Sequence, residues 1–500
     1  MTTRARWWAL TAVSLATLMT YLDNNVINVA IPTIQRSLHL SVTGLEWIVS
    51  SYLLVLAGLL LVGGRVADLY GRRRVFLAGL AIFTLSSLAA GLASSGGVLI
   101  GARAVQGLGA ALLMPATLAI ITHAFTDARE RTMAIGVWGA VGALGLGLGP
   151  VIGGVISQHV HWGWIFLINV PLGVITFAIA IPFIAESRAE SENRRLDVPG
   201  LVTSAIALFA LTYALIEGHD RGWTSPLIVA AFAVTALALG AFLAIEGRSA
   251  QPIVPLPMFR SRELSGGMVT MMIWAFGILG IYFFTSIYLQ TILGFSPTKA
   301  GLAFVPMALA IALAATLAPR VAAMIGGHRT VSLGVALMVV GLILFARLGG
   351  GIGYGSLMPG FLLFGIGAGL MNVPLTNTVM DAAPVHQAGM TGALINNSRE
   401  VAGLLGITVI GAVLRARQGT ALRGGASARD AFLDGYHTGL WVTIALLAAG
   451  VVLSYVTLRP RLQERREVPA AGSARETAIV PEAVPAAAID ARQLDGTRDS

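Results

Sequence analysis

The stretch GRVADLYGRRRV, from Gly64 to Val75, forms a short basic turn between two long apolar segments, residues 45–64 and 75–94. A helix needs roughly 20 mostly apolar residues to cross a bilayer, and both segments have about this length. Glycine and arginine are common in turns at a membrane surface. The stretch therefore predicts two membrane helices joined at that surface.

Outward from this turn, the 500-residue chain contains fourteen such segments. Its composition, 56% hydrophobic and 11% charged residues, is typical of many membrane helices in succession and excludes a sizeable soluble domain. The first segment is longer than the core of a signal peptide and lacks a clear cleavage site, so we expect it to remain as a helix. We predict an all-α membrane protein. The fourteen predicted transmembrane helices are residues 7–31, 45–64, 75–94, 98–121, 132–156, 164–185, 198–217, 226–245, 267–290, 300–323, 330–347, 355–378, 392–414 and 439–458.

The arginines follow the positive-inside rule if the N-terminus is cytoplasmic. Both termini are then cytoplasmic, in a multi-pass protein of the cell (inner) membrane. The arginines placed on the cytoplasmic side are Arg4, Arg6, Arg72, Arg73, Arg74, Arg129, Arg131, Arg188, Arg194, Arg195, Arg248, Arg260, Arg262, Arg320 and Arg329. Four arginines break the rule, because the loop predicted after residues 392–414 lies outside. These are Arg415, Arg417, Arg423 and Arg429.

The net charge of +9 is explained by this topology rather than by nucleic-acid binding. The chain has no cysteine, which excludes disulfides and thiolate metal sites. His159 and His161 are expected to be loop residues rather than metal ligands, because no further ligand has a suitable spacing. We expect no cofactor and no metal.

A second turn, PRVAAMIGGHRT from Pro319, resembles the first at an offset of 255 residues, from Gly71 to Gly326. Ala323 stands where the first copy has Asp68. A chance match between basic turns is the alternative, but the offset predicts two six-helix halves separated by two inserted helices. Pseudo-symmetric halves are typical of alternating-access carriers. The predicted domains are a cytoplasmic N-tail (1–6), an N-terminal six-helix bundle (7–185), inserted helices 7 and 8 with linkers (186–263), a C-terminal six-helix bundle (264–458) and a disordered cytoplasmic tail (459–500).

The first turn resembles the loop signature of the major facilitator superfamily: a glycine, an acid four residues on, a second glycine and basic residues. An aspartate here can accept charge-assisted hydrogen bonds from an arginine or a helix N-terminus and so latch one conformation. A basic loop that only sets topology is the alternative. The predicted latch residues are Gly64, Arg65, Asp68, Gly71 and Arg72.

Two charged residues lie inside predicted membrane helices. Asp23, in YLDNNVINVAIP, lies roughly 12 Å from the outer end of its helix, and Arg103, in LIGARAVQGLGAA, lies roughly 8 Å from the outer end of its own. Intramembrane charges are costly and normally functional, so we expect the two to be partners. A purely structural ion pair, or an Arg103 that reaches outward to the interface, is the alternative.

The block around Asp23 also resembles the helix 1 signature of the fourteen-helix drug:proton antiporters, and the segment of Arg103 resembles the one whose arginine is linked to proton movement. The string GLGLGPVIGG resembles the antiporter signature found in exporters of the superfamily; ordinary glycine packing is the alternative. Its predicted motif residues are Gly145, Gly149, Pro150, Gly153 and Gly154.

Glu400, in ALINNSREVAGLLG, lies roughly 12 Å inside its predicted helix. The resemblance implies proton or cationic-drug recognition for an acid at this place, although many members have glutamine there; a headgroup-facing residue is the alternative. Polar and aromatic residues on other helices are candidates for a substrate cavity, with helix packing or lipid contact as the alternative. These are Asn24, Asn28, Gln106, Trp274, Tyr282 and Asn396.

The chain has no GxxxxGK[ST] sequence and no clustered nucleophile and base, so we expect neither an ATP-binding domain nor an enzyme. We predict a proton-coupled exporter of amphipathic drugs or antibiotics that works by alternating access. Its partners would be a small-molecule drug, protons and membrane lipids, and no nucleic acid. An importer or symporter of a small solute on the same scaffold, or a membrane-embedded sensor or enzyme, is the alternative.

Overall fold

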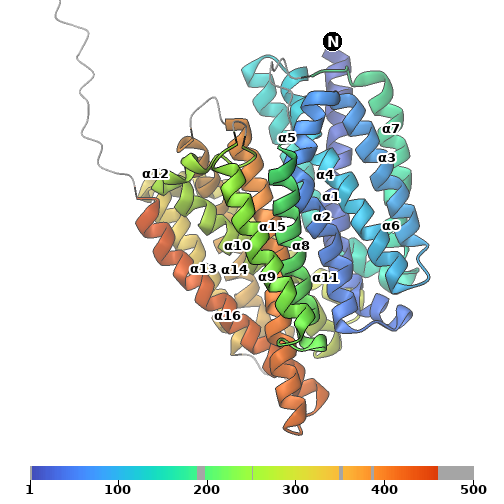
Figure 1. The fold of residues 1–500 in the computed structure, drawn as a ribbon, viewed down its shortest axis with the longest axis vertical. Coiled ribbons are helices and arrows are strands. Elements are labelled where there is room, and N and C mark those ends of the chain that lie inside the picture. The colour runs from blue at the N-terminus through green and yellow to red at the C-terminus, as the bar shows by residue number, and fades with distance from the viewer. Residues whose placement is uncertain (1–2, 189–196, 250–251, 348–352, 384–387, 460–500) are drawn as a thin grey trace, which may run out of the picture. The chain divides into compact units, whose positions relative to one another are not determined.

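A computed structural model describes residues 3–188, 197–249, 252–347, 353–383 and 388–459 (Figure 1). The first half contains α1 (Thr3–Leu38), α2 (Val42–Tyr70), α3 (Arg72–Gly91), α4 (Gly96–Ala124), α5 (Ala128–His159), α6 (Trp164–Leu167) and α7 (Asn169–Phe183). Two further helices, α8 (Val198–Arg221) and α9 (Pro226–Glu246), precede a short 3-10 helix, Leu256–Arg260. The second half contains α10 (Arg262–Thr291), α11 (Pro297–Ala303), α12 (Val305–Ile325), α13 (Gly327–Ala346), α14 (Tyr354–Asp381), α15 (Ala388–Arg423) and α16 (Ala428–Thr457).

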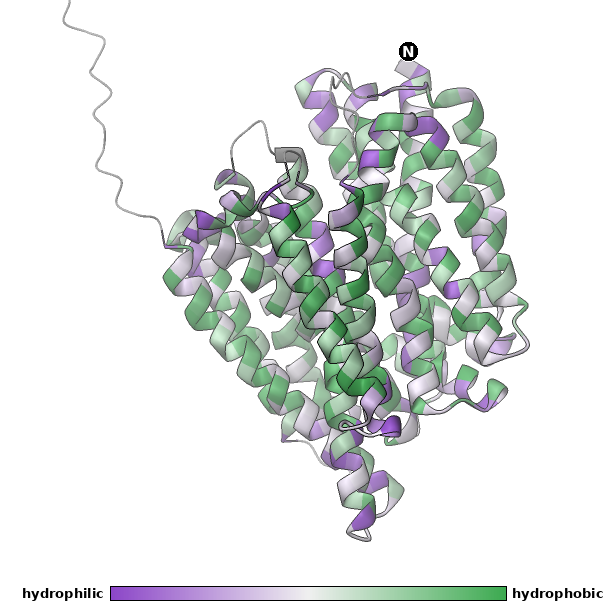
Figure 2. Cartoon of the chain, viewed as in Figure 1, coloured by the Kyte–Doolittle hydropathy of each residue, from purple (hydrophilic) through white to green (hydrophobic). Residues whose placement is uncertain are grey.

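Every predicted segment coincides with a long helix or with an interrupted pair, α6 with α7 and α11 with α12. The prediction of an all-α membrane protein is confirmed. Within the described ranges, twelve helices are long and apolar enough to cross a membrane. The two remaining segments, α1 and α15, carry the intramembrane charges Asp23, Arg399 and Glu400. Figure 2 shows hydrophobic residues mainly along the helices and hydrophilic residues mainly at their ends.

Several helix boundaries follow from caps that the sequence supplies. Ser41 accepts a hydrogen bond from the Gly44 N–H at the start of α2, and Asp127 accepts two at the start of α5. Such caps satisfy backbone donors that have no partner within the helix. Because the connections are short, consecutive helices run antiparallel.

The repeat of the basic turn has the same backbone geometry in both copies. Gly71 ends α2 with φ +111° and Gly326 ends α12 with φ +93°, a region that only glycine adopts readily. The Gly71 N–H donates to the Ala67 carbonyl at 3.1 Å, and the Gly326 N–H donates to the Ala322 carbonyl at 2.9 Å. The two copies of the turn therefore share the same kind of helix cap, which agrees with the resemblance between their sequences.

The prediction of a loop over residues 415–438 is wrong. α15 continues to Arg423 and α16 already begins at Ala428, so that this hairpin projects beyond the neighbouring helices (Figure 1). Most residues after the apolar run are good helix formers, and they extend the helix beyond that run. Arg415 is consequently buried and ion-paired, and Arg417 pairs with Asp434 at 2.8 Å. α1 likewise begins at Thr3, inside the predicted N-tail, whereas most of the predicted C-tail lies outside the described residues.

The start of α1 and the end of α16 lie at the same end of the helices (Figure 1). We call this the terminal side, and we call the opposite side, which holds the end of α1 and the start of α2, the far side. Between the halves, α5 contacts α11, α2 contacts α15 and α1 contacts α10. α8 packs against α2 and α15, whereas the apolar stretch of α9 is only 6% buried and faces outward.

Candidate functional site

Asp23 and Arg103 meet in the interior of the first half. Asp23 is on α1 and Arg103 is on α4, and both side chains are fully buried. The Arg103 Nη1 donates to the Asp23 Oδ2 in a close ion pair. The structure therefore brings together the two charges that the sequence predicts as partners.

Further polar groups complete the surroundings of the aspartate. Gln106 Nε2 donates to Asp23 Oδ1 at 2.8 Å, and Asn169 Nδ2 donates to the same oxygen at 3.0 Å. Gln106 Oε1 accepts from Arg103 at 2.7 Å, and Gln106 Nε2 also donates to Ser87 Oγ at 2.7 Å. Both carboxylate oxygens are thus hydrogen-bonded, as a buried ion needs to offset its loss of hydration. We call Asp23, Arg103, Gln106, Ser87 and Asn169 the α1–α4 network.

Aromatic and backbone groups hold the arginine from the other side. The Arg103 guanidinium lies over the Tyr52 ring at 4.2 Å and over the Phe166 ring at 5.6 Å. Its Nε donates to the Ile48 carbonyl at 3.3 Å. The cation is therefore balanced by one carboxylate, two ring faces and a carbonyl, an arrangement stable enough for a charge in the membrane interior.

Sequence reasoning missed Ser87, Asn169 and Tyr52. A polar residue inside an apolar run is a signal, and Asn169 in the segment 164–185 carries it. Gln106 was predicted for the substrate cavity, and the structure places it in the α1–α4 network, with no exposed surface.

A second polar group lies on α15 of the other half. The Arg399 guanidinium lies 5.4 Å from the Trp274 ring centre. Tyr21 of α1 lies near Arg399 and Glu400, which belong to the other half. Among the described residues, the Glu400 Oε2 atom is buried and has no hydrogen-bond partner. It is available for a proton or a cation.

The other predicted cavity residues are distributed over both halves. Asn24 is half-buried, and Asn28 is buried and donates to the Asn24 carbonyl at 3.4 Å. Tyr282 stacks on Phe304 with ring centres 4.2 Å apart. Asn396 is exposed on α15. Among the described residues, no side-chain hydrogen bond or ring contact joins these four side chains to one another.

The predicted latch lies on the terminal side, in the turn between α2 and α3. Arg72 donates to the Asp68 Oδ1 from Nη2 at 2.9 Å and from Nε at 3.1 Å. The turn also contacts Glu186, which accepts from the Arg73 N–H at 3.1 Å. Gly64 packs on Pro115 of α4, Gly71 packs on Glu186, and Arg65 lies in the last two turns of α2. These contacts stay within the first half and the start of the linker that follows it, and none of them reaches the second half.

The glycine motif of α5 contacts two helices. A Cβ at Gly149 would overlap Asn25 of α1, and one at Gly153 would overlap the Val26 carbonyl. Gly145 packs on the same helix, against Leu18. On its other face, Gly154 meets the Pro297 carbonyl of α11, and a Cβ at Gly301 would overlap the Pro150 carbonyl. The motif therefore joins α5 to α1 within one half and to α11 of the other half on the far side.

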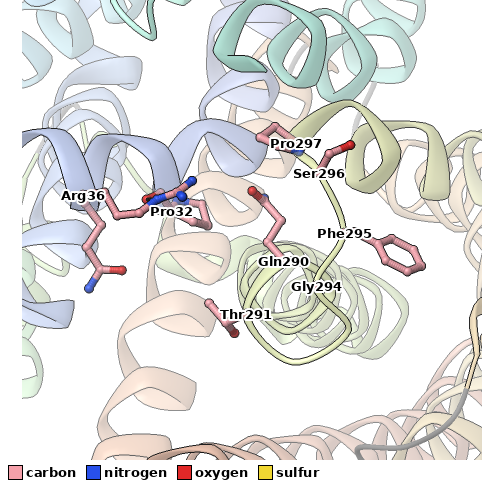
Figure 3. Close-up of a pocket in the computed structure, with 9 residues that line it drawn as sticks. Pro32, Arg36, Gln290, Thr291, Gly294, Phe295, Ser296 and Pro297 are labelled. Atoms are coloured by element: carbon pink, nitrogen blue, oxygen red, sulfur yellow. Dashed lines mark hydrogen bonds between the residues drawn. The ribbon is translucent and has the colours of Figure 1, made fainter. Parts of the chain in front are cut away.

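A pocket of about 480 Å³ lies beside this contact between the halves (Figure 3). Pro32 and Arg36 of α1 line one wall, and Gln290, Phe295 and Pro297 line the other. Gln290 Nε2 donates to the Val29 carbonyl of α1 at 2.9 Å. The pocket belongs to the far-side seam between the halves.

Two six-helix halves, a buried and charge-balanced centre, and contacts concentrated on one side define a membrane carrier. A family model described as the Major Facilitator Superfamily matches residues 13–407. The chain belongs to this superfamily, and it is a transporter rather than an enzyme.

Its relatives include the puromycin resistance protein pur8 of Streptomyces alboniger, which is 35% identical over 490 residues that cover 95% of each chain. The tetracenomycin C resistance and export protein of Streptomyces glaucescens is 34% identical and covers 83% of this chain and 77% of that protein. A solved bacterial homolog of the human lysosomal transporter Spinster, inward-facing and unoccupied, has a TM-score of 0.64 at 16% identity. The match covers 92% of this chain and 98% of the chain of the Spinster homolog, and it shows that the two share a fold.

Proposed function

We propose that this protein exports a drug or antibiotic across the cell membrane in exchange for protons, and that Asp23 is a proton-binding group. The observation that carries the proposal is a fully buried carboxylate, paired with an arginine and hydrogen-bonded by two amides, inside a carrier fold. The names of the relatives, which are resistance and export proteins, support export and a drug-like substrate.

The proposed orientation has both termini in the cytoplasm. Basic turns on the terminal side, such as Arg72 to Arg74 and Arg129 with Arg131, support it. With this orientation the far side faces outward. Because the contacts between the halves lie there, we take the structure to represent a state that is closed on the outside.

In the proposed cycle, the first half (residues 7–185) and the second half (residues 264–458) rock about the centre. The inserted helices and their linkers (residues 186–263) stay attached between them. When the far side is open, a proton from outside adds to the Asp23 carboxylate and removes its charge. The ion pair with Arg103 is then weakened, and the balance between outward and inward states shifts. Release of the proton to the cytoplasm restores the pair, and the carrier takes up its substrate.

Other predicted residues receive roles in this proposal. Glu400 is a second site for a proton or for a cationic substrate, with Trp274 and Tyr282 as aromatic contacts and Asn24, Asn28 and Asn396 as polar ones. Gln106 holds Asp23 and Arg103 in register. Gly145, Gly149, Pro150, Gly153 and Gly154 provide a smooth helix face, and the turn Gly64–Arg72 latches the opposite conformation through Asp68.

A drug-susceptibility panel in an efflux-deficient bacterial host tests the proposal. Wild type should raise resistance to one or more amphipathic antibiotics, and Asp23→Asn should abolish the increase at equal membrane expression. Asp434→Asn is the matched control, because it also removes an aspartate paired with an arginine, at a site that is 40% exposed. The proposal fails if Asp23→Asn retains full resistance, or if no compound in the panel distinguishes wild type from the empty vector.

A further inference from the structure

A second buried ion pair joins the two halves. Glu46 of α2 and Arg415 of α15 approach to 2.6 Å between Oε2 and Nη1, with side chains that are 0% and 5% exposed. α2 belongs to the first half and α15 to the second. Because Glu46 is in the first turns of α2 and Arg415 is in the last turns of α15, the pair lies on the far side.

The inserted helix α8 takes part in this contact. Arg415 Nη2 donates to the Ile216 carbonyl at 3.0 Å and to the Leu215 carbonyl at 3.3 Å. These oxygens lie in the last two turns of α8, where the helix dipole also favours a cation. Arg415 therefore binds the carboxylate of one helix and the carbonyls of another at the same time.

α8 is itself fastened to α2. Trp47 Nε1 donates to Glu217 at 2.9 Å, and Thr43 Oγ1 donates to Asp220 at 2.6 Å. α2 and α8 therefore form one surface, and Arg415 is the group that α15 brings to it. If the halves separate on the far side, Arg415 must leave both sets of acceptors.

The geometry of the pair suits reversible separation. Although the charges are close, neither Glu46 oxygen has a hydrogen-bond partner among the described residues, and the same is true of Arg415 Nε and Nη1. A buried pair held by charge without aligned hydrogen bonds is strong only while both partners stay in place. Gly411 of α15 leaves the space for the carboxylate, because a Cβ there would overlap Glu46 Oε1.

We infer that Glu46, Arg415 and the Leu215 and Ile216 carbonyls form a clamp that holds the far side closed, so that the inserted helix α8 takes part in gating. The clamp goes beyond the proposed function, because it concerns the two conformations and not the substrate or the proton. Removal of Arg415 leaves a buried carboxylate without its counter-charge in the closed state, and opening of the far side relieves this cost.

Spin-label distance measurements on the full chain in lipid nanodiscs test the clamp, without drug or pH gradient. The natural sequence has no cysteine, so that labels go only to introduced ones. Leu92→Cys with Leu422→Cys reports the far side, and Met133→Cys with Met324→Cys reports the terminal side; all four positions are exposed. Arg415→Gln should increase the ratio of far-side-open to far-side-closed molecules about tenfold and shorten the terminal-side distances.

Arg417→Gln is the matched control, because Arg417 lies two residues away on α15 and pairs with Asp434 within the same half. It should leave both distance distributions unchanged. Glu46→Gln should open the far side less than Arg415→Gln, because Arg415 keeps its α8 carbonyls. The charge swap, Glu46→Arg with Arg415→Glu, should not restore closure, because it places a carboxylate against those carbonyls.

If Arg415→Gln does not yield folded protein, Gly411→Ala tests the clamp in its place. Its new methyl group displaces the Glu46 carboxylate, while both charges are retained. It should open the far side in the same direction. Unchanged far-side distances in a folded Arg415→Gln or Gly411→Ala variant would overturn the clamp. So would an equal change in Arg417→Gln, or closure restored by the charge swap. Loss of resistance in Asp23→Asn has no bearing on these outcomes, and the two proposals therefore fail separately.

Discussion

The protein contains two buried carboxylate–arginine pairs that differ in how they are held. Asp23 and Arg103 lie within one half, and both aspartate oxygens accept hydrogen bonds from side chains. Glu46 and Arg415 join different halves, and neither glutamate oxygen finds a hydrogen-bond donor in the described part of the chain. Both pairs are buried, and both join a carboxylate to an arginine. They differ because the Asp23 carboxylate accepts supporting hydrogen bonds from side chains and, within the described ranges, the Glu46 carboxylate does not.

This difference separates two uses of an intramembrane ion pair. In the proposed cycle, a pair inside one half, whose carboxylate is hydrogen-bonded on both oxygens, keeps its partners together while a proton weakens the pair and its release restores it. A pair between halves has to form and break in each cycle, and extra aligned hydrogen bonds would stabilise one state too strongly. The predictions below test this contrast, from the largest expected effect to the smallest.

Arg103→Met should have the largest effect on stability. It leaves Asp23 buried without its cation, which costs about 3–5 kcal/mol of folding free energy. Thermal unfolding in detergent should show a large drop in the midpoint. The double variant Asp23→Asn/Arg103→Met should recover much of the stability, because no charge remains buried, and it should still fail to transport. Equal stability of the single and double variants would contradict the coupling of these two residues.

Gly153→Ala should destabilise by about 1–3 kcal/mol, because the new methyl group overlaps the Val26 carbonyl of α1 within the first half. Gly154→Ala overlaps the Pro297 carbonyl of the other half and should open the far side with less change in the unfolding midpoint. Gly147→Ala on the same helix is the control, since its nearest neighbour is 3.9 Å away. If all three variants unfold alike, the glycine face does not distinguish the two contacts.

Replacement of both clamp residues, Glu46→Gln/Arg415→Gln, should change the free energy of unfolding by about 1 kcal/mol or less, because no unpaired charge is left buried. Transport should nevertheless slow, since the far side no longer closes firmly. Unfolding midpoints and drug uptake into everted vesicles measure the two effects. A stability loss as large as that of Arg103→Met would remove the contrast between the pairs.

Asp68→Asn should have the smallest effect on stability. Its ion pair with Arg72 is partly exposed, with side chains that are 34% and 18% accessible, and such pairs contribute about 0–1 kcal/mol. If Asp68 latches the opposite conformation, transport falls far more than stability does. If this variant retains full transport activity, the turn does not latch a conformation and only sets the membrane topology.

Much of the fold follows from the sequence, because a bilayer imposes a helix length that apolar runs reveal directly. Asp23 and Arg103 lie at similar depths in their apolar segments, and this similarity is enough to predict that the two residues are partners. Residues that complete the α1–α4 network, such as Ser87 and Asn169, depend on how α3 and α7 pack, which no local pattern records.

The clamp was missed for a different reason. Glu46 lies at the edge of the segment 45–64, where an acid is expected to face water, and Arg415 follows the apolar segment 392–414, which predicts an outer loop. Each residue is the counter-charge that allows the other to be buried, and the two are 369 positions apart in the sequence, from Glu46 to Arg415. Helical continuation of α15 beyond its apolar run, driven by ordinary helix formers, hides the partner from a hydropathy analysis.

Proton movement in reconstituted vesicles tests the central claim most directly. Purified protein would be sealed in liposomes with a pH-sensitive dye, and an antibiotic identified by the susceptibility panel would be added. Wild type should move protons opposite to the drug, and Asp23→Asn should move none while it remains folded. Equal proton flux in Asp23→Asn and wild type, or drug accumulation that persists with the pH difference collapsed and no other ion gradient, would contradict the account.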